Sequence, residues 1–385
     1  MTRTGTARAQ ASLSDCTLVD MDSHVGERLH EDLLPHIENE GVRRMIGHTN
    51  GIEEAARKIY SATRVTPEFA QTKEASSSSD GRWGEGLVHK EARDAETKLA
   101  FMDKFDLDYS VLTPGINLGL ASVNHDQTAV AISRAYNRWM AETFYDASDR
   151  LGSAILVAHQ RPDLAADVID DWADEDDAVA VQLPAAGLVP PAGHRWFDPI
   201  YEAAQKNDLP ILMHTGNSTT TNVFPVQRNW SETFIEDHFF TFPIEGMWHL
   251  NSMVFQGVFE RFPDLQLVMQ EAGVEWLPWL MWRMDAHYLQ NSQDVPLLER
   301  LPSEYIRDSC HFATQPLGHT DTPRHLAKLI EIAGGAETVV FATDHPHPDF
   351  DTPEEMFQLL NTNAEFDADD IQAILGETAL GLFDF

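Results

Sequence analysis

Carboxylates and imidazoles follow two apolar runs that lie at opposite ends of the chain. In LVDMDSHV, residues 18–25, the apolar start leads into Asp22 and His24. In TVVFATDHPH, residues 338–347, the apolar run ends at Asp344. A strand that ends in such groups suits a site at the open end of a parallel sheet, where these side chains bind transition metals or move protons. Both segments are therefore candidates for one site.

Two further apolar runs end in groups of the same kind. His214 follows residues 209–213, and Glu271 comes shortly after residues 265–269. His159 follows another such run. One histidine at the end of a strand is usually an ordinary polar residue, but several corresponding strand ends that all carry ionisable groups indicate a functional site.

Strand geometry predicts how these side chains meet. Alternate residues of a strand share a face, so Asp20, Asp22 and His24 would lie on one side, and Asp22 and His24 could both point into the mouth of a barrel. His214 and Asp344 would join them from later strands. Such a mixed set suits Zn²⁺ first, with Mn²⁺ or Fe²⁺ as alternatives, and does not suit Ca²⁺. The sequence therefore predicts a divalent metal ion as cofactor.

Eight short runs of apolar or β-branched residues supply the strands, and helical patterns separate most of them. Residues 129–144, for example, are apolar with a period of 3.6. Strands that alternate with helices indicate a parallel sheet, and eight such units predict an α/β fold, the closed (β/α)8 TIM barrel, whose first and last strands are neighbours. The predicted strands are Thr17–Asp20, Tyr109–Thr113, Ala154–Ala158, Ala178–Leu183, Ile211–Met213, Leu265–Met269, Cys310–Ala313 and Val339–Ala342.

Two long segments interrupt this pattern. The first runs from the end of strand one to about Leu107, and the second, residues 217–247 after strand five, is rich in aromatic residues. Loops after the strands of a barrel form the rim of its active site, so the second insertion is a candidate lid. We expect residues 1–15 to be a flexible leader and residues 16–385 to form a single barrel domain.

The composition excludes several classes of partner. The chain has 62 acidic and 27 basic residues, a net charge of −35. Binding to nucleic acid or to anionic membranes needs Lys and Arg, so we expect neither partner. An acidic surface of this kind is typical of a halophilic protein that stays soluble at high salt. The expected partner is a small-molecule substrate, and the chain could also form a homo-oligomer.

Cysteine usage points to a reducing compartment. The chain has two cysteines, Cys16 and Cys310. Two thiols cannot form a disulfide scaffold or a cysteine-rich zinc site, so we expect a cytoplasmic protein. The first residues show no signal-peptide pattern, and no segment approaches twenty consecutive apolar residues.

Seven segments, spread over nearly the whole chain, match the pattern of one family in its order. They are VDMDSHVGE (19–27), AYNRWM (135–140), LPILMHTG (209–216), FPDLQLVMQEAGVEWLPWLMWRMDAHY (262–288), CHFATQP (310–316), VVFATDHPHPDFD (339–351) and ILGETALGLF (374–383). The chain resembles the amidohydrolase superfamily, in the branch of metal-dependent hydrolases and decarboxylases that includes aminocarboxymuconate semialdehyde decarboxylase. This resemblance implies a (β/α)8 barrel with one divalent metal ion, and it places the ligands at Asp22, His24, His214 and Asp344.

Two positions depart from the family pattern. The first family motif is commonly His-x-His, and Asp22 stands in the place of its first histidine, as an acid does in certain aromatic acid decarboxylases. After strand six, many members have a histidine that assists the reaction, where this chain has Glu271. Glu271 could relay protons itself or accept a hydrogen bond from a ligand histidine. Alternatively, His238 or His249 could replace the missing imidazole.

The candidate roles can be stated together. Asp344 and Glu271 are the candidate catalytic residues. Five others are candidates for contacts with the substrate or with the metal ligands: Glu27, His159, His238, His249 and His347.

The site predicts three functions, in order of preference. In a metal-dependent hydrolase, the metal lowers the pKa of a bound water toward ~7, the water attacks a C–N or C–O bond of a small organic substrate, and Asp344 is the general base. In a metal-dependent non-oxidative decarboxylase, the metal binds oxygens of an aromatic or unsaturated acid, and Asp344 or a histidine protonates the carbon that loses CO₂. The third function is a barrel that binds a ligand without catalysis.

Overall fold

Eight parallel strands form one sheet in which each strand lies beside the next in sequence order. The computed structural model describes residues 12–48, 92–216, 234–318, 322–347 and 351–383. The strands are β1 (Val19–His24), β2 (Tyr109–Thr113), β3 (Leu151–Leu156), β4 (Ala178–Pro184), β5 (Ile211–His214), β6 (Leu267–Gln270), β7 (Cys310–Ala313) and β8 (Val339–Val340).

The two ends of the sheet are joined by backbone hydrogen bonds. The N–H of Met21 donates to the carbonyl of Phe341, and the N–H of Asp344 donates to the carbonyl of Asp22, both at 2.9 Å. The sheet is therefore a nearly closed barrel, and the predicted (β/α)8 fold is confirmed.

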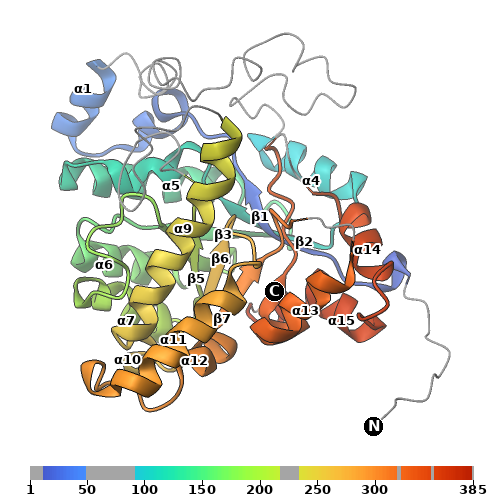
Figure 1. The fold of residues 1–385 in the computed structure, drawn as a ribbon. Coiled ribbons are helices and arrows are strands. Elements are labelled where there is room, and N and C mark those ends of the chain that lie inside the picture. Colours follow the sequence, from blue (N-terminus) through green and yellow to red (C-terminus); the bar gives the residue numbers. More distant parts are fainter. Residues whose placement is uncertain (1–11, 49–91, 217–233, 319–321, 348–350, 384–385) are drawn as a thin grey trace.

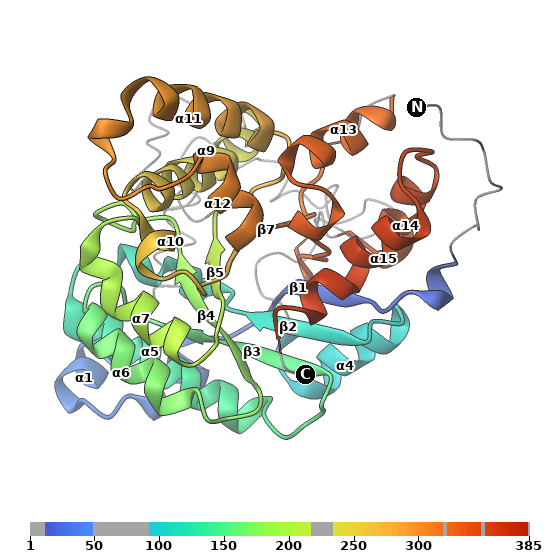
Figure 2. The ribbon, with the colours of Figure 1, turned by 90° about the horizontal axis from the view of Figure 1, so that it is seen from below.

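Helices alternate with the strands and surround them, as the side view and the view from below show (Figures 1 and 2). Local sequence explains several of their starts. The side chain of Asp94 caps α4 by accepting the N–H of Thr97, and Thr352 caps α14 with Pro353 in its first turn. The helices are α1 (Glu40–His48), α4 (Ala95–Lys104), α5 (Asp126–Thr143), α6 (Pro162–Trp172), α7 (Asp198–Lys206), α9 (Phe234–Phe255), α10 (Val258–Arg261), α11 (Leu277–Asn291), α12 (Pro302–Ser309), α13 (Arg324–Ala333), α14 (Pro353–Asn361), α15 (Ala368–Gln372) and α16 (Thr378–Leu380).

A small apolar layer fills the barrel. Val19 and Met21 of β1 pack in it with residues of six other strands, and Phe383 near the C-terminus belongs to the same cluster. A larger apolar cluster includes the outward-facing strand residues and the helices. The barrel is therefore a packed core and not a pore, so polar side chains gather where the strands end.

All eight predicted strands overlap with observed ones, but the first is longer than expected. We predicted its end at Asp20, whereas β1 continues to His24 because Ser23 and His24 pair with Leu112 and Thr113 of β2. The polar residues beyond the predicted end, Asp22 to His24, are therefore part of the sheet. The site is thus built on a rigid element.

The segment predicted as the second insertion overlaps with a long helix between β5 and β6. The described part of this helix, α9, is Phe234–Phe255. It continues through Pro243, a residue that disfavours a helix interior and obscures the helix in the sequence. Residues 217–233 of this insertion, residues 49–91 of the first and residues 1–11 of the leader lie outside the described residues. Within the described ranges, no helix has the length and apolar character needed to span a membrane.

Candidate metal centre

An irregularity in β1 decides which of its acidic residues face the barrel mouth. Val19 and Met21 point into the barrel, so Asp20 points outward, where it accepts the N–H and the hydroxyl of Thr343, each at 2.7 Å. The pairing of β1 with β2 shifts between Asp20 and Ser23. Regular alternation would put Asp20 and Asp22 on the same side, as we predicted. The shift separates them and turns Asp22 toward the mouth.

Four predicted ligands meet at this point. One ligand atom each of Asp22, His24, His214 and Asp344 lies within 4.8 Å of the others, and all four residues are buried. The Nε2 atom of His24 lies 3.0 Å from Oδ1 of Asp344, and Nε2 of His214 lies 3.2 Å from Oδ2 of Asp22. Two carboxylates and two imidazoles at these distances could bind one divalent metal ion.

A backbone carbonyl orients each imidazole. Nδ1 of His24 donates to the carbonyl of Pro114 at 2.7 Å, and Nδ1 of His214 donates to that of Thr215 at 2.5 Å. Because a neutral imidazole has one N–H, its lone pair is left on Nε2. Neither Nε2 atom makes a hydrogen bond of good geometry with the residues that are described. Buried nitrogen lone pairs in this state fit a metal ligand.

Electrostatics favour the same protonation states. Burial alone would raise the pKa of Asp22, but the imidazoles of His214 and His24 outweigh it and lower the pKa to about 2. The hydroxyl of Thr113 also donates to Oδ1 of Asp22 at 2.7 Å. Burial holds the pKa of His24 well below its usual value. An ionised carboxylate beside a neutral imidazole is the form that binds a metal.

Glu271 lies at the edge of this set. Its Oε2 atom is 3.6 Å from Nε2 of His214. Its backbone has φ +54°, and that of Asp344 has φ +61°, a left-handed region that is costly for these residues and that recurs at functional sites. Gly216 makes room for it, because a Cβ atom there would lie 3.0 Å from Oε2 of Glu271 and 2.6 Å from the ring of Phe242.

Glu27 supports the site from the loop after β1. Its buried carboxylate accepts the N–H of Gly115 at 3.1 Å and, from Asn117, the backbone N–H at 2.8 Å and the side-chain amide at 2.9 Å. These residues follow Pro114, whose carbonyl orients His24. Burial raises the pKa of Glu27 to about 7 although the hydrogen bonds oppose the shift. Glu27 thus holds the segment that follows β2 and carries the carbonyl of Pro114.

Two other predicted histidines occupy different positions. His159 follows β3, is buried near the ring of Phe197, and has its pKa lowered by burial to about 4. His249 of α9 accepts the N–H of Ala192 on Nδ1 at 3.2 Å and donates from Nε2 to the carbonyl of Ala185 at 2.9 Å. Both its nitrogens are therefore engaged, and it does not replace the imidazole missing after β6. The side chain of His238 lies outside the described residues.

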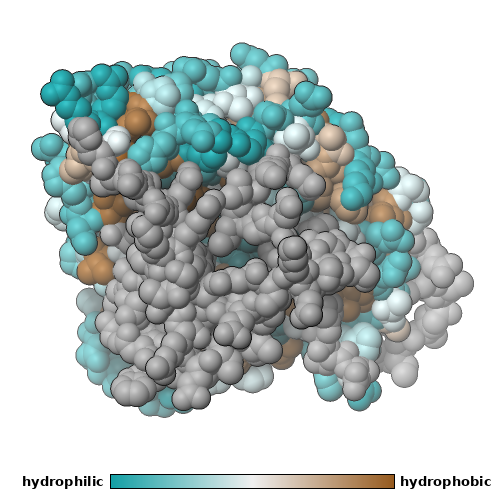
Figure 3. All heavy atoms as spheres, turned by 90° about the horizontal axis from the view of Figure 1, so that it is seen from above, coloured by the Kyte–Doolittle hydropathy of each residue, from teal (hydrophilic) through white to brown (hydrophobic). Residues whose placement is uncertain are grey.

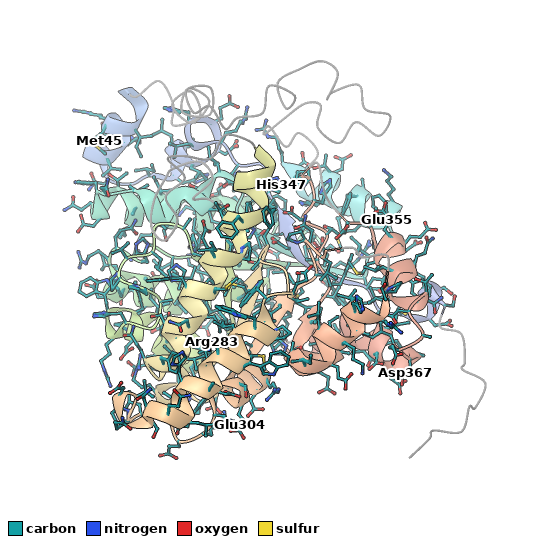
Figure 4. All side chains as sticks on the ribbon, viewed as in Figure 1. Met45, Arg283, Glu304, His347, Glu355 and Asp367 are labelled. Atoms are coloured by element: carbon teal, nitrogen blue, oxygen red, sulfur yellow. The ribbon has the colours of Figure 1, made fainter. Side chains whose placement is uncertain are left out.

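His347 borders the four ligands. Its ring meets that of His24 edge-on, with 4.7 Å between the ring centroids, and its Nε2 lies 3.9 Å from Oδ1 of Asp344. The side chain is 29% exposed, and Figure 4 shows it at the upper end of the barrel. This position fits a contact with both a ligand and a substrate.

A buried cation lies close to this site and was not among the predicted residues. Lys98 of α4 is fully buried, and its ammonium donates to the hydroxyl of Ser23 at 2.8 Å. Burial lowers the pKa of Lys98 to about 7 and raises that of the nearby Asp20 to about 6. The available signal was its place four residues before Met102, which is also buried, so helical periodicity puts Lys98 on the core face of α4.

Comparison with known proteins agrees with this fold. The family model described as Amidohydrolase matches residues 36–385. Similar solved structures include an amidohydrolase from Mycobacterium avium subsp. paratuberculosis K-10, with 20% identity, a TM-score of 0.71 and coverage of 96% of this chain and 99% of that chain. The 5-carboxyvanillate decarboxylase of Sphingomonas paucimobilis has 20% identity, a TM-score of 0.66 and the same coverages, 96% and 99%.

A third structure is the 5-carboxyvanillate decarboxylase of Novosphingobium aromaticivorans DSM 12444, in complex with manganese and 4-hydroxy-3-methoxy-5-nitrobenzoic acid. It has 16% identity, a TM-score of 0.66 and coverage of 99% of this chain and 100% of that chain. At these identities the structural likeness shows the fold, whereas the family model matches most of the chain. The chain belongs to the amidohydrolase family of enzymes.

Proposed function

We propose that this protein is a metal-dependent non-oxidative decarboxylase of an aromatic carboxylic acid. The buried set of two aspartates and two histidines carries the proposal. Two of the similar structures are 5-carboxyvanillate decarboxylases, and these relatives support decarboxylation over hydrolysis, which the sequence alone had ranked first. An acid at the position of Asp22 also fits aromatic acid decarboxylases. The third alternative, a barrel that binds a ligand without catalysis, is not favoured because the chain belongs to a family of enzymes.

The residues of the site have different roles in the proposed reaction. Asp22, His24, His214 and Asp344 would hold the metal, which when bound supplies a Lewis acid that binds and polarises oxygen atoms of the substrate. The bond between the ring carbon and the carboxylate breaks, and its electron pair stays on the ring carbon. Asp344 delivers the proton that forms the new C–H bond, and CO₂ leaves. Glu271, which is 8% exposed, would pass protons between Asp344 and solvent.

We infer that the metal is a divalent transition ion. The sequence favours zinc, whereas a similar structure contains manganese. Nitrogen and oxygen ligands in equal number accept either ion. Elemental analysis of the purified protein, followed by reloading of the chelated protein with each ion, will identify the one that supports turnover.

The test is a substrate panel with two readouts. Protein loaded with Mn²⁺ or Zn²⁺ is incubated with hydroxylated aromatic acids, including 5-carboxyvanillate, and with lactones and amides. We expect CO₂ release from an aromatic acid and no hydrolysis of the other compounds. Hydrolysis of a lactone or an amide without CO₂ release from any acid would reject the decarboxylase and restore the hydrolase.

A further inference from the structure

Lys98 lies behind the metal centre, on the outer side of the barrel wall. Ser23, which accepts its hydrogen bond, alternates along β1 with Asp22 and His24, whose side chains face the mouth. Helix α4, which carries Lys98, flanks β1 and β2 in both ribbon views (Figures 1 and 2). A cation in this position does not reach a substrate in the mouth. A completely buried lysine is rare unless its charge is compensated.

The ammonium lies at the seam where the barrel closes. Besides the hydroxyl of Ser23, it lies 3.4 Å from Nδ1 and 3.5 Å from the carbonyl oxygen of His345. Ser23 and His345 pair with each other in a parallel bridge between β1 and the chain after β8. The same carbonyl of His345 accepts the N–H of His24 at 2.8 Å. Lys98 therefore contacts both sides of the seam.

Each residue that Lys98 contacts is the immediate neighbour of metal ligands. Ser23 lies between Asp22 and His24, and His345 follows Asp344. One turn along α4 from Lys98, the ring of Phe101 stacks on the ring of His345, with 3.6 Å between centroids and 21° between planes. An ammonium and an aromatic ring of one helix thus fix the backbone that presents three of the four ligands.

The charges around the seam support the same role. Three carboxylates are buried there: Asp20, Asp22 and Asp344. One lysine and one divalent ion together carry three positive charges, which balance these three carboxylates. Asp20 faces the same outer side as Lys98 and stabilises its charged form. Lys98 therefore compensates a carboxylate that the metal itself would not neutralise.

We propose that Lys98 is a positioning residue of the metal centre, which ties β1 to the chain after β8 so that Asp22, His24 and Asp344 share one divalent cation. This inference rests on the metal centre proposed above. It assigns Lys98 a role in the affinity for the ion and no contact with the substrate.

The test compares two variants with a matched control. Lys98→Met keeps the length and the apolar part of the side chain, and Ser23→Ala removes one hydroxyl. Lys104→Met makes the same change at an exposed position of the same helix. Chelated proteins are titrated with Mn²⁺ by calorimetry, the bound ion is examined by electron paramagnetic resonance, and melting is recorded with and without Mn²⁺.

We expect the Kd for Mn²⁺ to rise about tenfold or more in Lys98→Met, to rise about threefold in Ser23→Ala, and to stay unchanged in Lys104→Met. The increase in melting temperature that Mn²⁺ causes should shrink in the same order, and the resonance spectrum should change in Lys98→Met. A merely structural lysine would instead lower both melting temperatures in parallel, with an unchanged Kd, and that result would overturn the role.

Two further outcomes keep the proposals separate. If Lys98→Met does not fold, Ser23→Ala decides, and an unchanged Kd and spectrum in that variant reject the positioning role. A wild-type protein that binds no divalent ion would overturn the metal centre and the role of Lys98 together. If the wild-type protein binds Mn²⁺ and Lys98→Met binds it with the same Kd, only the role of Lys98 is overturned.

Discussion

His24 and His214 each have Nδ1 hydrogen-bonded to a backbone carbonyl, which leaves Nε2 of both imidazoles able to bind a metal. Carbonyl groups of Pro114 and Thr215 can only accept hydrogen bonds, so they hold the proton on Nδ1. The residue types and their strand-end positions predicted that these imidazoles would meet Asp22 and Asp344, because the ends of parallel strands converge at the mouth of a barrel. The carbonyl partners could not be predicted, because backbone orientation after a strand leaves no residue-specific signal.

Asp344 should be needed for both the metal and the reaction. Asp344→Asn keeps the size of the side chain but removes its charge and its capacity to carry a proton. We expect the Kd for Mn²⁺ to rise and CO₂ release to fall about 10³-fold or more. Asp163→Asn, which changes an exposed acid on α6, is the control and should behave as wild type. Full turnover by Asp344→Asn would remove this residue from the mechanism.

Glu271 should affect turnover more than metal binding. Glu271→Gln preserves the shape of the side chain and meets the same backbone cost at φ +54°, so the stability should change little. We expect about one Mn²⁺ per chain, as in wild type, with kcat lowered about 10²-fold because the proton carrier is lost. An unchanged kcat would mean that Glu271 is not on the proton path, and a lost metal would place it among the ligands.

At the scale of elements, the site depends on the irregular strand β1 and on a loop clamp. The loop clamp is the set of hydrogen bonds by which Glu27, in the loop after β1, holds Gly115 and Asn117 after β2. The shift in β1 between Asp20 and Ser23 turns Asp22 into the mouth. The apolar run that begins at Thr17 predicted β1 itself, but the sequence gives no sign of a bulge, which depends on the pairing with β2. The helix α9 was missed for a related reason, because the cost of Pro243 is local and the packing of the whole helix outweighs it.

The loop clamp made by Glu27 should give the protein a pH-dependent stability. The folded protein holds a proton on Glu27 up to about pH 7, against a usual pKa of 4.5. The folded state therefore binds more protons between these values, and the free energy of unfolding falls as the pH rises through them. Glu27→Gln cannot ionise, so it should gain stability relative to wild type over this range, on the order of 3 kcal/mol.

Urea unfolding of both proteins between pH 4 and pH 8 measures this difference. Glu96→Gln, an exposed acid on α4, serves as the control and should follow the wild-type curve. Parallel curves for wild type and Glu27→Gln would show that Glu27 titrates in the folded protein as it does in the unfolded chain, which would contradict the effect of its burial.

At the scale of the whole molecule, the order of the strands and helices predicts the fold, and the composition predicts the properties of the surface. Eight strand-like runs separated by helical patterns were enough to predict the barrel, because a parallel sheet of this kind admits few other closures. The charge of −35 has no part in that argument. It concerns the surface, and the face seen from above is largely hydrophilic where residues are described (Figure 3).

The excess of acidic residues should make stability depend on salt. Like charges repel one another more in the compact folded state than in the expanded unfolded chain, and raising the salt from 0.1 M to 1 M shortens the screening length from about 10 Å to about 3 Å. We therefore expect the melting temperature to rise by several degrees as KCl increases over this range.

Chloride is chosen because sulfate would also strengthen the burial of apolar groups. Saturating Mn²⁺ in every sample keeps the metal centre constant, so the change reports on the surface. A melting temperature that does not change with KCl would mean that the acidic residues are already compensated locally, and the protein would then not be halophilic.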